Sequence, residues 1–311
     1  MPTRKVAVIA IGGNSLILSQ DQYRALCVTG KHIVSLVELG YQVVVTYGNG
    51  PQVGFLLWRS EVAHATSGLH GLPLVTCVAD TQGGIGYQIQ QTLKNEFLRR
   101  GLCEDSIAVL TQVVVDKDDP GFRNPTKPVG AFLTEDEAVR LANETGATFK
   151  EDAGRGWRQV VASPIPRRIV EFDAVRDLVE DGYVVVSTGG GGVPVFETEN
   201  GYVGTPAVID KDRSSALMAA ELGADMLIIL TAVEKVCVNF NTPEQEEISE
   251  MTAAQAREYI AQGQFAPGSM LPKVEACIEY VEAYPEGKAL ITSLECAAAG
   301  LRGETGTVIV A

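Results

Sequence analysis

The stretch that decides the fold is Lys5–Asn14, which has the sequence KVAVIAIGGN. Its apolar part, Val6–Ile11, carries no polar side chain, as expected for a strand buried on both faces of a sheet. The run breaks at Gly12 and Gly13 and no A-x-A cleavage site follows, which argues against a signal peptide. It is also far shorter than the about 20 apolar residues that a membrane span needs. The stretch therefore predicts the first strand of a parallel sheet, and neither a signal peptide nor a membrane anchor.

Strand-like and helix-like segments alternate along most of the chain, which is typical of a mainly parallel sheet covered by helices on both faces. Further strands are predicted at Val43–Thr46, Ile107–Val115, Tyr183–Ser187, Met226–Leu230, Ala289–Thr292 and Thr307–Val310. Helices are predicted at about Gln20–Leu39, Asp80–Arg100, Lys211–Leu222, Thr252–Gln262 and Met270–Ala283. The pattern predicts the α/β fold class.

Residues 117–166 depart from this alternation, because their first part is dense in proline, asparagine and aspartate. The segment is too long for an ordinary connection between a strand and a helix. We interpret it as an inserted subdomain that protrudes from the sheet and contributes to the site. The alternative is a surface excursion with no role.

Composition excludes several classes of protein. Hydrophobic residues make up 46% of the 311 residues, as in globular proteins, and the formal net charge is −14. A nucleic-acid partner is not expected, because binding to phosphate backbones needs a basic surface. The six cysteines are scattered without zinc-ligand spacing, which favours a reducing compartment and predicts a cytoplasmic protein.

Glycine-rich turns follow three of the predicted strands, at Gly12–Gly13, Gly48–Gly50 and Gly189–Gly192. Loops at the carboxyl ends of parallel strands form the ligand crevice, and glycine lets backbone N–H groups approach an anion. For any single loop, the alternative explanation is that a tight turn between a strand and a helix needs glycine for steric reasons alone. The chain has no Walker A loop and no G-x-G-x-x-G, although Gly48–Gly54 is a G-x-G-x-x-x-G variant that leaves a nicotinamide-binding protein open.

Three lysines stand at rigid turns. Lys127 lies between Pro125 and Pro128, and Lys211 lies between two aspartates where a helix is expected to begin. Lys273 follows Pro272 at the start of another predicted helix. A solvated surface lysine is the alternative at each position. Their shared placement favours a site that handles phosphate without a P-loop.

At these residues the chain resembles the carbamate kinases of the amino-acid kinase family, over essentially its whole length. The segments that carry the resemblance are Ile11–Asn14, Gly48–Gly54, Gln82–Tyr87, Asn124–Pro128, Glu151–Arg158, Gly189–Pro194, Val208–Asp212 and Gly263–Met270. Each segment alone is modestly specific, whereas all of them in this order are a strong indication.

The resemblance implies a three-layer α/β/α sandwich with a protruding subdomain, in a homodimer. Residues 1–205 would form a lobe that binds carbamate or carbamoyl phosphate, and residues 206–311 a lobe that binds the nucleotide. The implied reaction is reversible phosphoryl transfer between carbamoyl phosphate with Mg²⁺-ADP and carbamate with Mg²⁺-ATP, running towards ATP in nitrogen catabolism. Only small molecules are implied as ligands.

The resemblance also assigns roles to residues. Lys127 would reach the transferring phosphoryl group, Lys211 and Lys273 would steady the phosphates, and Asp212 would hold these last two lysines in register. The predicted substrate-binding residues are Gly12, Gly13, Asn14, Gly48, Asn49 and Gly50. The predicted nucleotide-binding residues are Gly190, Gly191, Lys211, Thr231, Val236, Met270 and Lys273. Carboxylates near these lysines would hold Mg²⁺ through water, and the resemblance assigns no particular ligand.

Relatives in the family commonly carry a lysine before the first glycine loop, where this chain has Ala10 and Ile11. A lysine delivered by the insertion would replace that cation, which makes Lys127 diagnostic. The chain also departs from the expected pattern at Ser15, Tyr47, Thr205–Pro206, Thr231–Val233 and Leu271. A sibling kinase for another small carboxylate, or a nucleotide-binding paralogue without activity, therefore remains an alternative.

Overall fold

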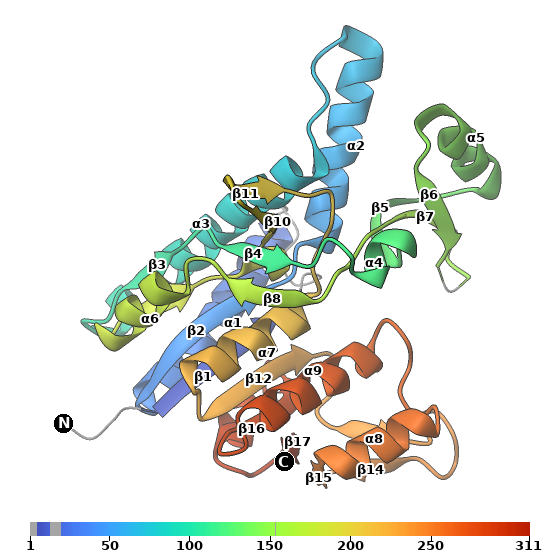
Figure 1. The fold of residues 1–311 in the computed structure, drawn as a ribbon. Helices are drawn as coiled ribbons and strands as arrows, with labels where there is room; N and C mark the ends of the chain where they lie inside the picture. The colour runs from blue at the N-terminus through green and yellow to red at the C-terminus, as the bar shows by residue number, and fades with distance from the viewer. Residues whose placement is uncertain (1–4, 13–19, 153) are drawn as a thin grey trace.

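A mainly parallel sheet with helices on both faces forms the centre of the computed structural model, which describes residues 5–12, 20–152 and 154–311 (Figure 1). In spatial order its strands are β15 (Glu250–Thr252), β17 (Thr307–Val310), β16 (Lys288–Ser293), β12 (Met226–Thr231), β1 (Lys5–Ile11), β2 (Tyr41–Tyr47), β9 (Val184–Val186) and β3 (Ser106–Ala108). Neighbouring strands run parallel except β16 and β17. The predicted α/β class is confirmed.

The central strand β1 is buried from both sides, which explains its uninterrupted apolar sequence. Successive side chains of a strand point to opposite faces. Val8 and Ala10 pack into one hydrophobic core, whereas Ala7 and Ile9 pack into the other, and all four are fully buried. One short stretch thus contributes to both cores.

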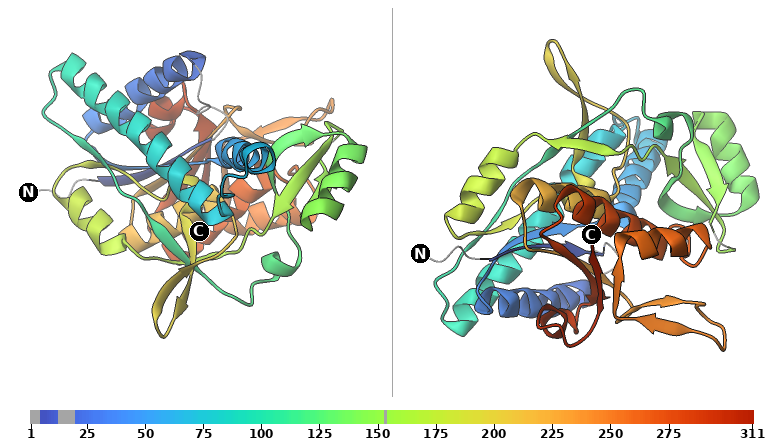
Figure 2. Two further views of the ribbon diagram at one scale, coloured as in Figure 1. Left: turned by 90° about the horizontal axis from the view of Figure 1, so that it is seen from above. Right: turned by 60° about the horizontal axis from the view of Figure 1, so that its bottom comes forward.

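The helices cover the two faces of the sheet as separate layers (Figure 2). On one face lie α1 (Gln20–Glu38), α3 (Leu74–Arg100) and α10 (Ala297–Leu301). On the other face lie α6 (Phe172–Glu180), α7 (Lys211–Leu222), α8 (Ala253–Ala261) and α9 (Met270–Ala283). The structure therefore has the three-layer arrangement that the resemblance implied.

A second sheet joins the central one on the side of β3. Its order is β11 (Gly201–Gly204), β10 (Val193–Thr198), β4 (Gln112–Val115) and β8 (Pro166–Ile169). The prediction of a single strand over Ile107–Val115 is wrong, because β3 and β4 belong to different sheets. The Gln82 side chain explains the break: it accepts from the Thr111 backbone N–H at 2.6 Å and donates to the Thr111 carbonyl at 3.2 Å.

Most of residues 117–166 form a small body that projects from the sheet beside α2 (Gly50–Ser67) (Figure 1). Its elements are α4 (Pro120–Arg123), β5 (Lys127–Leu133), α5 (Glu135–Thr145), β6 (Thr148–Glu151) and β7 (Trp157–Val161). The three strands form an antiparallel sheet in the order β5-β7-β6. We call residues 117–166 the subdomain.

The subdomain rests on α2 through a contact between two glycines. A Cβ atom added at Gly54 of α2 would lie 2.0 Å from the Gly130 backbone nitrogen of β5. The backbones can approach this closely because Gly54 has no side chain. A Cβ atom at Gly130 would meet open space, and glycine suits this position because its φ is +78°. The hairpin of β13 (Val236–Val238) and β14 (Glu246–Ile248) forms a separate two-stranded sheet. Across the described ranges, no helix has both the length and the apolar composition of a membrane span.

Candidate active site

Four adjacent strands of the central sheet, β12, β1, β2 and β9, end at the same edge. Thr231 ends β12, Gly12 follows β1, Gly48–Gly50 follow β2 and Gly189–Gly191 follow β9. The predicted glycine turns therefore meet, as expected for loops at the carboxyl ends of parallel strands. Gly13 and Asn14, which were also predicted here, lie outside the described residues.

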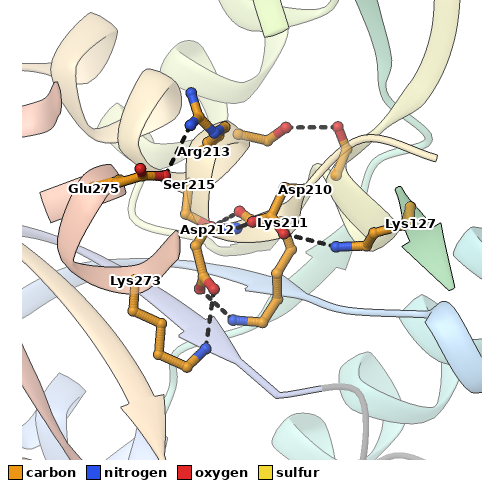
Figure 3. A network of polar contacts seen from close by, with 10 residues as sticks. Lys127, Asp210, Lys211, Asp212, Arg213, Ser215, Lys273 and Glu275 are labelled. Atoms are coloured by element: carbon orange, nitrogen blue, oxygen red, sulfur yellow. Dashed lines mark hydrogen bonds and ion pairs between the residues drawn. The ribbon is translucent and has the colours of Figure 1, made fainter. Parts of the chain in front are cut away.

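Two of the predicted lysines share one carboxylate at this edge. Lys211 and Asp212 lie in the first turn of α7, and Lys273 lies in the first turn of α9. The Lys211 Nζ donates to Asp212 Oδ1 at 2.5 Å, and the Lys273 Nζ donates to Asp212 Oδ2 at 3.0 Å (Figure 3). The structure thus brings Lys273 to the adjacent pair Lys211 and Asp212, although Asp212 and Lys273 are 61 positions apart in the sequence.

The third lysine arrives from the subdomain. Lys127 begins β5, and its Nζ donates to Asp210 Oδ2 at 2.6 Å (Figure 3). Asp210 precedes α7, and its other carboxylate oxygen accepts the backbone N–H of Asp212 at 2.9 Å, which caps the helix. Residues 127, 210, 211, 212 and 273 form one polar cluster, which we call the lysine cluster.

Burial and the neighbouring opposite charges shift the pKa values of Lys211 and Asp212 in opposite directions. Burial lowers the pKa of Lys211, the nearby Lys273 lowers it further, and the Asp212 carboxylate opposes both. Burial also opposes ionisation of Asp212, but Lys211 and Lys273 outweigh it and hold the pKa of this carboxyl below its usual value. Asp212 is thus ionised at neutral pH and offsets the repulsion between the two ammonium groups.

The lysine cluster lines a hollow of about 270 Å³, which we call the lysine hollow. Its walls also include Gly12, Gly48–Gly50, Gly190, Gly268, Ser269 and Pro272. Positive side chains, glycine turns and the N-terminal ends of α7 and α9 face the same space. Ammonium groups, backbone N–H groups and helix N-termini are all donors that favour phosphate.

Two further hollows continue from the lysine hollow. A middle hollow of about 360 Å³ shares Gly12, Gly268, Ser269 and Lys273 with it. A hairpin hollow of about 430 Å³, beside β13, shares Thr231, Ala232 and Ser269 with the middle hollow. Met270 and Phe240 also line the hairpin hollow. The three form one elongated groove, cationic at one end and largely apolar at the other.

The glycine turn after β9 packs against side chains at the end of β2 and in the turn that follows it. The Asn49 Nδ2 donates to Thr81 Oγ1 at 2.9 Å, and a Cβ atom at Gly190 would lie 2.1 Å from that nitrogen. The Tyr47 hydroxyl donates to the Gln82 carbonyl at 2.6 Å, and its ring lies against Gly189. Tyr47, one of the departures from the expected family pattern, is fully buried and does not line the lysine hollow; it contacts the glycine turn instead.

The predicted nucleotide-binding residues divide between the hollows. Gly190, Lys211 and Lys273 line the lysine hollow, whereas Thr231 and Met270 line the hairpin hollow. The Val236 side chain is fully buried, and Gly191 packs against the Ile209 carbonyl. Neither residue is among the described residues that line the lysine, middle or hairpin hollow. Strand alternation explains the first case, because Lys235 and Cys237, on either side of Val236, point into the hairpin hollow.

Sequence reasoning missed several residues that line the groove. Asp210 was noted only as a neighbour of Lys211, and its pairing with Lys127 gave no local signal. The β13–β14 hairpin was not predicted, so no role was given to its residues in the hairpin hollow, which include Cys237, Asn239 and Phe240. Gln264 and Phe265 also line this hollow and lay inside the recognised segment Gly263–Met270, but they were given no role. Ser269, which lines all three hollows, lay inside a recognised segment but was given no role.

The carboxylates of the cluster bear on where a metal ion could bind. Among residues 5–12, 20–152 and 154–311, no three His, Cys, Asp or Glu side chains gather as a metal site. Asp210 and Asp212 are the acids in the lysine hollow, and each already accepts from a lysine. This donor set fits a Mg²⁺ ion that nucleotide phosphates and water largely coordinate, with at most one or two carboxylates nearby.

The chain belongs to the amino acid kinase family, whose model matches residues 5–292. It is 48% identical to the carbamate kinase-like protein YahI of Escherichia coli, with 99% of each chain covered. It is 47% identical to the carbamate kinase of Clostridium perfringens, over 97% of this chain and 99% of that protein. A structure of carbamate kinase from Giardia lamblia bound to AMP-PNP superposes with a TM-score of 0.90 at 38% identity, covering 100% of this chain and 99% of the other.

Proposed function

We propose that this protein is a carbamate kinase, which transfers a phosphoryl group reversibly between carbamoyl phosphate with ADP and carbamate with ATP. The observation that carries the proposal is the lysine cluster, in which Lys127, Lys211 and Lys273 face one hollow. The near-complete coverage by carbamate kinases at 46–47% identity supports the choice of substrate. We expect the reaction to run towards ATP in nitrogen catabolism.

The cluster suits this chemistry because phosphoryl transfer needs alignment and charge neutralisation more than covalent help from the protein. Lys211 and Lys273, held by Asp212, would bind phosphate oxygens on the nucleotide side. Lys127 would bind the transferring phosphoryl group from the side of the subdomain. Each ammonium would thereby offset charge that spreads over the phosphoryl oxygens in the transition state.

The groove suggests how the two substrates lie. The nucleotide base would occupy the apolar hairpin hollow, and its phosphates would extend through the middle hollow to Lys273 and the N-terminal end of α9. Carbamoyl phosphate would enter the lysine hollow against Gly12 and Gly48–Gly50. In this arrangement residues 206–311 supply most of the nucleotide site, and both residues 1–205 and residues 206–311 line the other site.

Mg²⁺ would be held by the nucleotide phosphates, near the carboxylates of Asp210 and Asp212. The ion supplies charge neutralisation between adjacent phosphates. We expect chelation with EDTA to abolish ATP formation and added Mg²⁺ to restore it. ATP formation in the presence of EDTA and without added divalent cation would contradict the proposed requirement for Mg²⁺.

The direct test is ATP formation from carbamoyl phosphate and Mg²⁺-ADP, measured with luciferase on purified protein. We expect saturable ATP formation that depends on both substrates. ADP alone is the control for disproportionation of ADP by a contaminating kinase. If acetyl phosphate or another acyl phosphate supports faster turnover than carbamoyl phosphate, the protein is a sibling kinase for another carboxylate. Nucleotide binding without turnover would instead identify a non-catalytic paralogue.

A homodimer in the cytoplasm also belongs to the proposal. Apolar side chains stay exposed on α2, among them Phe55, Trp58 and Val62, and exposed apolar groups of this kind favour a protein interface. Light scattering coupled to gel filtration tests the dimer. A mass equal to the 33.2 kDa of one chain, at the concentrations used for the assay, would exclude it.

A further inference from the structure

The carboxylate of Asp210 has two partners, and they come from different parts of the fold. One oxygen caps α7 by accepting the Asp212 N–H, while the other accepts the Lys127 ammonium at 2.6 Å (Figure 3). Lys127 belongs to the subdomain, whereas Asp210 belongs to the C-terminal lobe, 83 positions further along the chain. A single carboxylate therefore joins the first turn of α7 to the first residue of β5.

The surroundings of this pair fix the backbone on both sides. The carbonyl of Ala162, which directly follows β7, accepts the Val208 N–H at 2.9 Å, and Lys127 pairs with Val161 in the subdomain sheet. The strand that carries Lys127 is thus anchored beside Asp210. What remains free to vary is the four-carbon side chain of Lys127, which is only 27% exposed and reaches the hollow from this anchored strand.

Charge explains why a carboxylate is needed here. Three ammonium groups face the lysine hollow, and their like charges repel one another. Asp212 offsets Lys211 and Lys273, which leaves Lys127 for Asp210. Burial opposes ionisation of Asp210, but Lys127, Lys211 and the Asp212 N–H hold the pKa of its carboxyl well below the usual range. The Asp210 carboxylate is therefore ionised at neutral pH, where the three lysines need a counter-charge.

We propose that Asp210 is a positioning residue for phosphoryl transfer: its carboxylate holds the Lys127 ammonium at the mouth of the lysine hollow, beside the N-terminal end of α7. This inference rests on the proposed function and adds a residue to it. An unpaired lysine side chain would sample many rotamers, and ordering it at the moment of reaction would cost rate. Asp210 orders Lys127 before substrate arrives.

The variant Asp210→Asn separates this role from helix capping, because asparagine caps helices as well as aspartate does. We expect kcat to fall roughly 10- to 100-fold, since a misplaced group of this kind costs up to about 10²-fold. The KM for carbamoyl phosphate should stay the same or fall, because the substitution removes a negative charge beside an anion site. Asp118→Asn, which neutralises an exposed carboxylate at the base of the subdomain, is the matched control and should leave kcat unchanged.

A double-mutant cycle with Lys127→Met tests whether Asp210 acts through Lys127. In the Lys127→Met background, Asp210→Asn should change kcat by less than about twofold, because the two residues act as one unit. An equal loss in both backgrounds would overturn the proposal and assign Asp210 an independent role. A wild-type kcat in Asp210→Asn would overturn it as well. Thermal melting checks that each variant is folded.

A second measurement needs no turnover and so keeps this inference distinct from the proposed function. Acylation of lysines by an amine-directed reagent, followed by mass spectrometry of the whole folded protein without substrates, reports how freely Lys127 moves. We expect Lys127 to be acylated several-fold faster in Asp210→Asn than in the wild type or in Asp118→Asn. Unchanged acylation of Lys127 would refute the positioning role even if the enzyme is active, whereas an inactive wild type with this increase would refute only the proposed reaction.

Discussion

The three lysines are the residues on which the proposed chemistry depends, and Lys127 is the one that tests it most directly. We expect Lys127→Met to lower kcat roughly 10²–10³-fold, or about 3–4 kcal/mol, as for the loss of one preorganised transition-state donor. Methionine keeps the unbranched side chain and removes only the charge and the donors. Steady-state ATP formation measures the effect.

Lys117→Met is the control for this variant, because Lys117 is an exposed lysine at the base of the same subdomain. It should keep the wild-type rate. A fully active Lys127→Met enzyme would remove the subdomain from the mechanism and contradict the assignment of Lys127 to the transferring phosphoryl group.

At the residue scale, the sequence predicts cations better than it predicts their partners. Lys127, Lys211 and Lys273 stand out because prolines or aspartates flank them, which is local information. The pairing of Lys127 with Asp210 is a tertiary contact and has no local signature. Val236 shows the opposite error: the resemblance assigns it to the nucleotide site, but its place in the unpredicted β13–β14 hairpin buries its side chain.

At the element scale, α3 is joined to α1 by a buried carboxylate. Glu96 accepts from Arg99 and Arg100, and Arg100 also donates to the Lys31 carbonyl of α1 at 2.8 Å. The hydrogen bond from Arg99, with that from Arg100, outweighs burial and lowers the pKa of Glu96 from 4.5 to about 2. The charged form of Glu96 therefore stabilises the fold.

This pKa predicts how stability depends on pH. Because the pKa is lower in the folded protein than in the unfolded chain, the stabilisation is present above pH 4.5 and is lost as the pH falls towards 2. Glu96→Gln should lower the free energy of unfolding by about 1–3 kcal/mol at pH 7 and by much less near pH 3. Urea denaturation followed by circular dichroism measures both values, with the exposed Glu199→Gln as control. A loss of equal size at both pH values would show that the charge of Glu96 is not the cause.

The contact between α2 and β5 predicts a change that affects activity. A Cβ atom at Gly54 would lie 2.0 Å from the Gly130 nitrogen, so Gly54→Ala must push the subdomain away from α2. Lys127 begins the same strand as Gly130 and should move with it. We expect kcat to fall by up to about 10²-fold, as for small misplacements of a catalytic group.

Gly83→Ala is the matched control for Gly54→Ala, because it is also a helical glycine but has open space where its Cβ would lie. It should keep the wild-type kcat and raise the free energy of unfolding by about 0.4–1 kcal/mol, through reduced freedom of the unfolded chain. An unchanged kcat in Gly54→Ala would show that the position of the subdomain does not limit the reaction.

Among the elements, the sequence predicts some helices in full and misses one whose apolar side chains are partly exposed. The predicted helices Lys211–Leu222 and Met270–Ala283 match α7 and α9 residue for residue. Helix α2 was not predicted, because apolar side chains such as Trp58 lie on its exposed side and blur the helical pattern. The split between β3 and β4 depends on the Gln82 side chain of α3, which no local pattern contains.

At the scale of the whole molecule, the site exists only where separate parts of the chain meet. The order of β12, β1, β2 and β9 brings the turns at their ends to one edge, which the parallel pattern alone could predict. The groove beyond that edge could not be predicted, because its apolar end depends on how the β13–β14 hairpin lies over the start of α9. The cationic end needs the subdomain as well.

This assembly predicts where nucleotide binding can be blocked without damage to the core. Ala232 follows β12, is exposed, and lines both the middle and the hairpin hollow. Mg²⁺-ADP should raise the melting temperature of the wild type, since a ligand at 100 times its Kd adds about 2.7 kcal/mol to the free energy of unfolding. Ala232→Trp fills the groove and should abolish this shift while leaving the melting temperature without ligand unchanged. Ala254→Trp, at an exposed position of α8 away from the groove, should melt with the same ADP-dependent shift as the wild type. If Ala232→Trp also keeps the full shift, the nucleotide binds elsewhere and the orientation proposed for the groove is wrong.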